Sequence, residues 1–169
     1  RFRVNAIDYS YYDHATRPLK DYIPVVIDEI ARSLESMRDR GYAATQVDWV
    51  GHSMGGLLPR AYYAQATHQV GRNWARASNY GDGDIHKLIL ITSPQSGSPL
   101  ATYIVNAMSD PSWGPSVKLA LATAFHNHTP DRSCAASLAT CSDELVALGE
   151  TKIPTFALLG LGGKNAMGN

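Results

Sequence analysis

The sequence predicts an α/β fold in which a parallel sheet is flanked by helices. Short apolar runs alternate along the chain with amphipathic helical segments, and parallel neighbouring strands require long crossovers of this kind. The chain has 169 residues, of which 44% are hydrophobic and 18% are charged. This length and composition suit one globular domain over residues 1–169.

Four apolar runs are expected to form the strands of this sheet. They are residues 4–8, 47–50, 87–92 and 155–159. A first helix is expected between Pro18 and Gly41, because apolar residues between these positions recur at helical spacing. These apolar residues are Ile23, Val26, Ile27, Ile30, Leu34 and Met37. Two further helices are expected, at 57–68 and 100–108.

The charge balance argues against two classes of partner. Fifteen basic residues oppose fifteen acidic ones, so no net charge attracts nucleic acid or an anionic membrane. The aliphatic run at 88–91 is far shorter than the roughly 18 residues that a membrane-spanning helix needs. We therefore expect no nucleic-acid partner and no transmembrane segment, and the sequence does not indicate a cell compartment.

The chain has two cysteines, Cys134 and Cys141, which excludes a disulfide-dense scaffold and a four-cysteine zinc site. If one helix joined them, their Cα atoms would lie roughly 10 Å apart, beyond disulfide reach. A loop would allow a bridge, so a disulfide and two free thiols both remain open.

His86, Asp82 and Asp84 lack the spacing of a recognised metal site, so no metal and no cofactor are assigned.

The pattern Gly-x-Ser-x-Gly occurs at residues 51–55, between a predicted strand and a predicted helix. A turn this sharp forces Ser53 toward a strained backbone conformation. Side chains beside it would collide with the strand and the helix, so Gly51, Gly55 and Gly56 are expected to keep the turn free of Cβ atoms. The pattern therefore predicts an exposed serine at the carboxyl edge of the sheet.

This placement suits Ser53 as a nucleophile. The start of the following helix has free N–H groups that favour a developing anion, and Met54 is expected to supply one of them from its backbone. His52, also in the turn, is expected to pack beside the strands and not to act as the base. The alternative is that Ser53 only caps the following helix.

Two segments resemble a known family. Residues 47–57 are similar to the nucleophile segment of lipases and esterases with the α/β-hydrolase fold. Residues 90–101 are similar to the segment after the next strand in lipases and in GPI inositol-deacylase-like hydrolases. The resemblance implies a partial α/β-hydrolase fold, a three-layer sandwich with a helical lid, and hydrolysis of a carboxylic ester through an acyl-Ser53 intermediate. A small-molecule or lipid ester would be the substrate.

The chain departs from these relatives at two positions. Gln95 stands where they often have histidine. Pro59 stands where they have a different residue, and it is expected to remove one helix hydrogen bond and kink the turn.

A serine hydrolase also needs a general base and an acid that orients it. The resemblance implies that the acid follows strand 155–159 and that the histidine comes later, but no Asp, Glu or His occurs after Glu150. Both residues, and the first three strands of the family, are therefore expected outside these 169 residues. Weaker candidates within the chain are His126 and His128 for the base, and Asp110, Asp131 and Asp143 for the acid.

The stretch 110–151 shows two or three short helix-like pieces, around 118–125 and 143–148, and no strand. A connection of this length inside an α/β domain is usually functional, so a lid is expected. Its apolar residues Leu119, Leu121 and Phe125 are expected to cover Ser53.

The alternative function is a non-catalytic binding module that lacks a complete triad. Sheet edges left exposed by missing strands would favour self-association.

Overall fold

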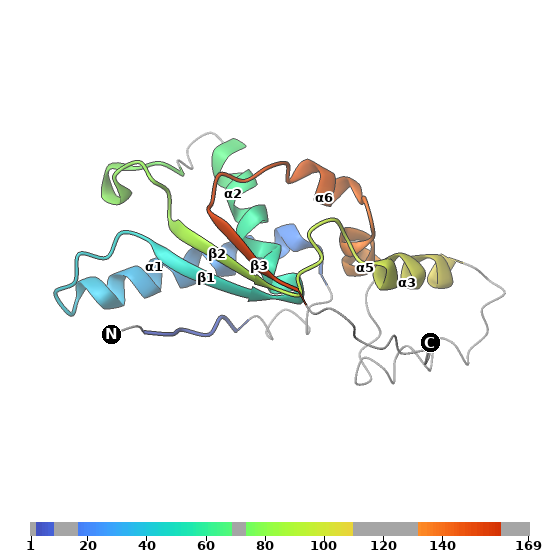
Figure 1. Cartoon of the computed structure of the whole chain (residues 1–169), viewed down its shortest axis with the longest axis horizontal. Helices are drawn as coiled ribbons and strands as arrows, with labels where there is room; N and C mark the ends of the chain where they lie inside the picture. The colour runs from blue at the N-terminus through green and yellow to red at the C-terminus, as the bar shows by residue number, and fades with distance from the viewer. Residues whose placement is uncertain (1–2, 9–16, 69–73, 110–131, 160–169) are drawn as a thin grey trace.

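The computed structural model describes residues 3–8, 17–68, 74–109 and 132–159. Its strands are β1 (Val47–His52), β2 (Ile85–Ile91) and β3 (Thr155–Leu158). Its helices are α1 (Ile23–Arg38), α2 (Leu58–His68), α3 (Pro99–Ser109), α5 (Arg132–Leu138) and α6 (Asp143–Ala147), with 3₁₀ turns η2 (Leu19–Tyr22), η3 (Ser53–Gly56) and η4 (Ala77–Asn79). The strands form one parallel sheet in the order β1-β2-β3 (Figure 1), which confirms the predicted α/β class.

The carboxyl ends of the three strands lie at one edge of the sheet. His52 pairs with Ile91, and Ile91 pairs with Leu158, so the last residues of β1, β2 and β3 are neighbours. Residues that follow these strands are therefore brought together, although they are far apart in sequence.

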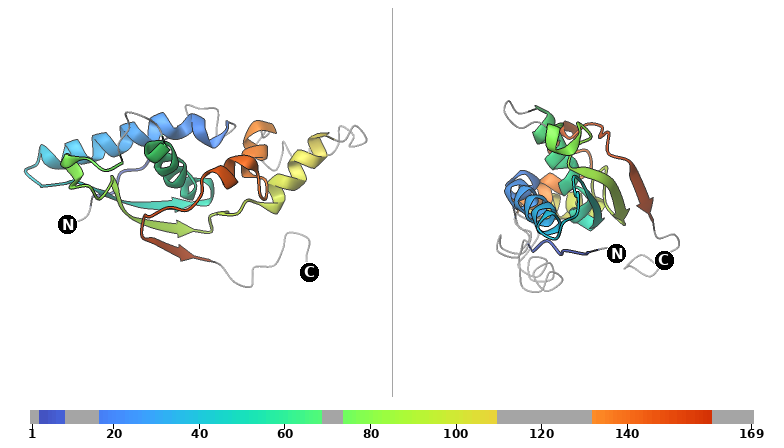
Figure 2. Two further views of the ribbon diagram at one scale, coloured as in Figure 1. Left: turned by 90° about the horizontal axis from the view of Figure 1, so that it is seen from above. Right: turned by 90° about the vertical axis from the view of Figure 1, so that its left-hand side faces the viewer.

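Helices α1 and α2 pack on one face of the sheet (Figure 2). The buried residues of this layer are Val26, Ile30 and Leu34 from α1, Leu57 and Leu58 at the start of α2, and Trp49, Leu88 and Leu90 from the sheet. Val50, Phe156 and Leu158 are exposed on the strands. The described residues thus form a partial α/β sandwich, in which the apolar stripe predicted for the first helix faces the sheet.

The strand predicted at residues 4–8 is wrong. This segment has no regular secondary structure and is mostly exposed. Its polar side chains bind α1: Arg3 Nη1 donates to Ser36 Oγ at 2.5 Å, and Asn5 Nδ2 donates to Ser33 Oγ at 2.7 Å. A strand needs backbone partners on a neighbouring strand, and these side-chain bonds hold the segment along a helix instead.

Pro59 shapes the start of α2. A helix continuous from Ser53 would bond the N–H of residue 59 to the carbonyl of Gly55, but proline has no N–H. The Gly55 carbonyl accepts a hydrogen bond from Trp49 Nε1 at 3.0 Å instead. The expected break therefore takes the form of a 3₁₀ turn, η3, followed by a new α-helix in which Pro59 is the second residue.

The helices predicted at 57–68, 100–108 and 143–148 are confirmed as α2, α3 and α6. Helix α5 was not expected from the sequence pattern. The helix-like piece at 118–125, with Leu119, Leu121 and Phe125, lies outside the described residues.

The turn after α5 is joined to the loop after β2. Ser98 N donates to Leu138 O at 2.8 Å, and Cys141 N donates to Ser96 O at 3.2 Å. Gly97 has a φ of 96°, and a Cβ there would lie 2.5 Å from Ala139 O. The chain segments on either side of 110–131 are therefore tightly packed together. Cys141 has a free, exposed thiol.

A buried carboxylate anchors the amino end of β2. Asp84 is only 1% exposed, and its carboxylate accepts hydrogen bonds from Tyr62 of α2 and from Arg76. Asn79 Nδ2 donates to Asp84 Oδ1 at 3.2 Å, and Val47 N donates to Asp84 O at 2.9 Å. Burial and the neighbouring Asp84 raise the pKa of Tyr62. Helix α2 and the loop before β2 thus meet at the carboxylate of Asp84, and the start of β1 bonds to its main-chain carbonyl.

We expect the substitution Tyr62→Phe to lower the free energy of unfolding by about 2 kcal/mol, because it removes a donor to a buried carboxylate. Chemical denaturation measures this change. Tyr42, which is 57% exposed, supplies the control Tyr42→Phe, with an expected change within about 0.5 kcal/mol. The folded pKa of Tyr62 is raised, so its stabilising effect is present below the unfolded pKa of about 10 and declines above it. Equal stabilities of the two variants would contradict the anchoring role of Asp84.

Candidate active site

Ser53 lies directly after β1, at the carboxyl edge of the sheet, and its side chain is exposed. Its φ of 52° is in the left-handed region, which serine rarely adopts. Strained backbone of this kind persists only where the surrounding structure enforces it, and it gathers at active sites. The geometry therefore has the strained, exposed serine that the sequence pattern predicts.

Two glycines allow the turn to approach its surroundings. A Cβ on Gly51 would lie 2.5 Å from the carbonyl oxygen of Gly55, and a Cβ on Gly56 would lie 2.4 Å from Ser93 Oγ. For Gly55 the expected collision is wrong, because a Cβ there meets nothing within 4 Å. What Gly55 provides is its carbonyl oxygen, which accepts the hydrogen bond from Trp49. The turn does not require residue 55 to lack a side chain.

The backbone after Ser53 offers hydrogen-bond donors. Leu57 N donates to Met54 O at 2.9 Å, which continues the 3₁₀ turn. The first N–H groups of a helix have no acceptor within it, and this applies to the N–H groups of Ser53 and Met54. The Met54 side chain is buried in the core. Packing of this side chain fixes the position of the backbone at the sheet edge.

Thr92 is a further strained residue at this edge, and sequence reasoning missed it. The strand predicted to end at Thr92 ends at Ile91, and Thr92 has a φ of 47°. Since His52 pairs with Ile91, Ser53 and Thr92 are the residues that follow the last pair of β1 and β2. The signal that could have found Thr92 is the strand register. If the ends of both strands had been known, the pairing of His52 with Ile91 would have put Ser53 and Thr92 at the same edge.

Gln95, which stands where relatives of this kind often have histidine, joins the turn to the loop after β2. Its Nε2 donates to Ser93 Oγ at 2.7 Å and to Gly56 O at 3.2 Å. Arg60 Nη1 donates to Gln95 Oε1 at 2.9 Å and to Gln95 O at 3.0 Å, while Nη2 donates to Gly149 O at 2.8 Å. Burial lowers the pKa of Arg60. The Arg60 guanidinium thus bonds α2 to the loop after β2 and to the segment after α6.

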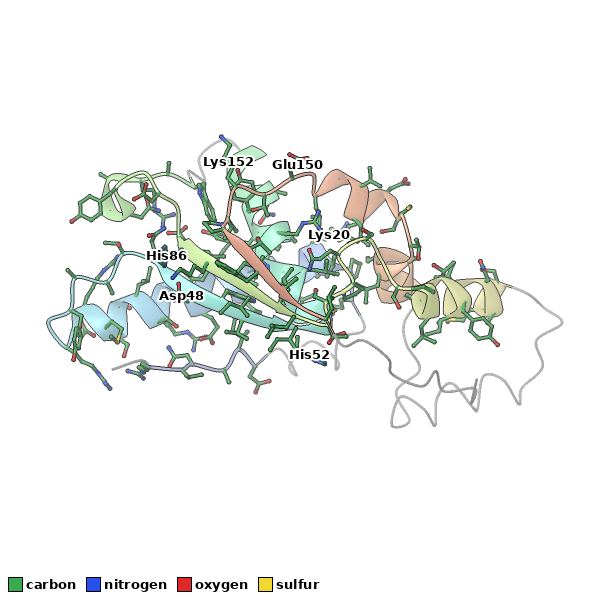
Figure 3. The ribbon with its side chains drawn as sticks, in the orientation of Figure 1. Lys20, Asp48, His52, His86, Glu150 and Lys152 are labelled. Atoms are coloured by element: carbon green, nitrogen blue, oxygen red, sulfur yellow. The ribbon has the colours of Figure 1, made fainter. Side chains whose placement is uncertain are left out.

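The described residues do not place a base at Ser53. The Ser53 hydroxyl has no hydrogen-bond partner among them. His86 Nδ1 lies 3.0 Å from Asp48 Oδ1, but Figure 3 places this pair at the amino end of the strands and His52 at the opposite end. Five residue-to-residue steps of about 3.3 Å each place Ser53 roughly 16 Å along the chain from Asp48, far beyond the roughly 3 Å needed for proton transfer.

The remaining candidates for the base and the acid do not complete the site. His52 is the last residue of β1 and is exposed. The expectation that it packs beside the strands is wrong, because its side chain is exposed, and no hydrogen bond joins it to Ser53. Asp143 is exposed in the first turn of α6. The other candidates, His126, His128, Asp110 and Asp131, lie outside the described residues.

The described residues hold neither a metal cluster nor a membrane-spanning helix. They contain no group of three or more His, Cys, Asp or Glu side chains that could hold a metal ion. They also contain no helix long and apolar enough to cross a membrane. A cavity of about 490 Å³ lies between α1, α2, α5 and α6, lined by residues that include Ile23, Ala64 and Leu148, and Ser53 is not among them.

The two glycines Gly56 and Gly55 give a matched test of the turn. We expect Gly56→Ala to lower the free energy of unfolding by about 1–3 kcal/mol, because its Cβ overlaps Ser93 and Leu90 in a packed interior. Gly55→Ala adds a methyl group into open space and should change stability by less than about 0.5 kcal/mol. Thermal or chemical denaturation of both variants measures the difference. Equal effects would show that the turn does not pack against the loop after β2.

Comparison with known proteins agrees with this geometry. A family profile described as alpha/beta hydrolase fold matches residues 1–148. The search of curated proteins found no matching sequence. The matched region contains β1, the Ser53 turn, α2 and β2, which are the elements that build the strained serine. The chain therefore belongs to the family of proteins with the α/β-hydrolase fold.

Proposed function

We propose that this protein is a serine hydrolase that cleaves carboxylic esters through an acyl-Ser53 intermediate. The observation that carries the proposal is the exposed Ser53, with a φ of 52°, at the carboxyl edge of a parallel sheet. A hydrolase-type function fits the family match. The likeness of residues 47–57 and 90–101 to lipases and esterases supports an ester substrate.

The proposed reaction has two steps. Ser53 Oγ attacks the ester carbonyl carbon, and its proton passes to a base while the carbonyl oxygen becomes an oxyanion. The Met54 N–H donates a hydrogen bond to this oxyanion, and the alcohol leaves with a proton returned from the base. Water then attacks the acyl-serine, which releases the carboxylic acid and restores the Ser53 hydroxyl.

The surface of α3 supports an ester with an apolar group. This helix, Pro99–Ser109, contains no charged residue. It is connected to β2 by the loop 92–98, and it exposes Leu100, Tyr103 and Met108. A small-molecule or lipid ester with an apolar acyl chain would find apolar surface near the carboxyl edge of the sheet.

A non-catalytic binding module is the second candidate. It is favoured by one observation, the lack of a histidine or a carboxylate bonded to Ser53 within the described ranges. In this case the protein would bind an apolar ligand or a partner protein and would catalyse no reaction on it. Chemistry at Ser53 separates the two candidates.

Covalent labelling tests the nucleophile. We expect a fluorophosphonate probe to label the full-length protein and the label to be lost in Ser53→Ala. Ser78 is an exposed serine in the loop before β2, so Ser78→Ala should label like the unsubstituted protein. Mass spectrometry of the labelled peptide identifies the site. Labelling that persists in Ser53→Ala would contradict the proposed nucleophile.

Turnover tests the base separately. We expect the 169-residue chain to hydrolyse a short p-nitrophenyl ester at no more than the residual level of a triad without its base, about 10³ to 10⁴ over water. A longer chain that continues with an Asp and a His should show full, Ser53-dependent turnover. Fast turnover by the 169-residue chain would place the base within it, with His126 and His128 the first residues to substitute. A longer chain that neither turns over nor labels would favour the binding module.

A further inference from the structure

We infer that Thr92 contacts the ester bound at Ser53 and limits the size of the acyl group that fits there. The inference rests on the proposed function and names a specificity-determining residue of the same site. It is carried by the position of Thr92, its backbone conformation and the contacts that hold it.

The position follows from the strand register. His52 and Ile91 are paired in the sheet, so Ser53 and Thr92 are the first residues beyond it on adjacent strands. Adjacent strands lie about 4.8 Å apart. Both side chains are exposed. An ester carbonyl within reach of Ser53 Oγ therefore lies next to Thr92.

The backbone conformation of Thr92 is costly for this residue type. A positive φ is uncommon for any residue other than glycine, and for a β-branched residue it is a genuine outlier. Four residues other than glycine have a positive φ within the described ranges, namely Ser53, Tyr80, Thr92 and Cys141. Among these, only Thr92 is β-branched, and only Ser53 and Thr92 lie side by side at the edge of the sheet.

The side chain of Thr92 gains no stabilising hydrogen bond from the described residues in return. Its hydroxyl makes no hydrogen bond within the described part of the protein, and the side chain is exposed. A glycine or an asparagine would satisfy the same backbone at lower cost. An exposed threonine held in this costly conformation beside Ser53 is accessible to a ligand bound there, and the proposed nucleophile indicates the ester.

The surrounding structure holds the strained backbone in place. Thr92 N donates to Leu158 O at 3.0 Å. The next residue, Ser93, accepts a hydrogen bond from Gln95, which is itself held by Arg60. Bonds on both sides therefore fix the position of Thr92 before a ligand arrives, as a residue that sets substrate size requires.

Substitution of Thr92 gives two readouts. We expect Thr92→Gly to raise the rate on a bulky, branched acyl ester, p-nitrophenyl 2-methylbutyrate, by about tenfold relative to p-nitrophenyl acetate, because it removes the blocking side chain. Its melting temperature should be unchanged or higher, since relief of the strained φ offsets the greater freedom of glycine in the unfolded chain. Thr92→Asn, which also tolerates a positive φ, should keep the discrimination against the branched ester.

Tyr80 supplies the matched control. It has a similar φ of 55° and is exposed, but it follows η4, on the loop before β2. Tyr80→Gly should leave the ratio of the two rates unchanged, whatever its melting temperature.

The outcomes distinguish this inference from the proposed function. If the full-length protein shows no Ser53-dependent hydrolysis or labelling, both fail. If it is active but Thr92→Gly keeps the original ratio of rates, only the role of Thr92 fails. If Thr92→Gly and Thr92→Asn both lower the melting temperature, threonine stabilises the fold, and the argument from strain is wrong.

Discussion

The close approach of the Ser53 turn to the loop after β2 is the constraint on which the site depends. It is possible only because Gly51 and Gly56 lack a Cβ, with the nearest atoms at 2.5 Å and 2.4 Å from where one would be. Gln95 then spans the gap by donating to Gly56 O and Ser93 Oγ. Because the turn is packed this closely, the backbone must reverse direction within a few residues. The positive φ appears at Ser53, the exposed residue that follows β1.

The buried polar network and the strained, exposed residues lie at opposite ends of the same sheet. At the amino end the buried Asp84 accepts hydrogen bonds at its carboxylate from α2 and from the loop before β2, and at its main-chain carbonyl from β1. At the carboxyl end Ser53 and Thr92 have exposed side chains and left-handed backbones. Because polar groups at the first end are satisfied and buried, the second end can hold strained residues without unfolding.

The sequence was sufficient to predict three of the strands, the first helix and the position of Ser53, since apolar periodicity and the Gly-x-Ser-x-Gly pattern are local signals. It could not predict the fate of residues 4–8, because pairing of an apolar run depends on a distant neighbour. Nor could it separate Gly55 from Gly56, since only their surroundings differ. Thr92 was assigned to the strand because its sequence does not reveal a positive φ.

The Arg60 guanidinium shows how the site is joined to the segment that follows α6. Half-burial of a guanidinium is unfavourable unless its donors are bonded. Here Nη1 donates to two oxygens of Gln95, and Nη2 donates to the carbonyl of Gly149, which has a φ of 59° and follows α6. These bonds make one side chain of α2 the common partner of the loop that carries Thr92 and of the end of α6. The geometry at Ser53 therefore depends on how the chain returns to β3, and not only on the turn itself.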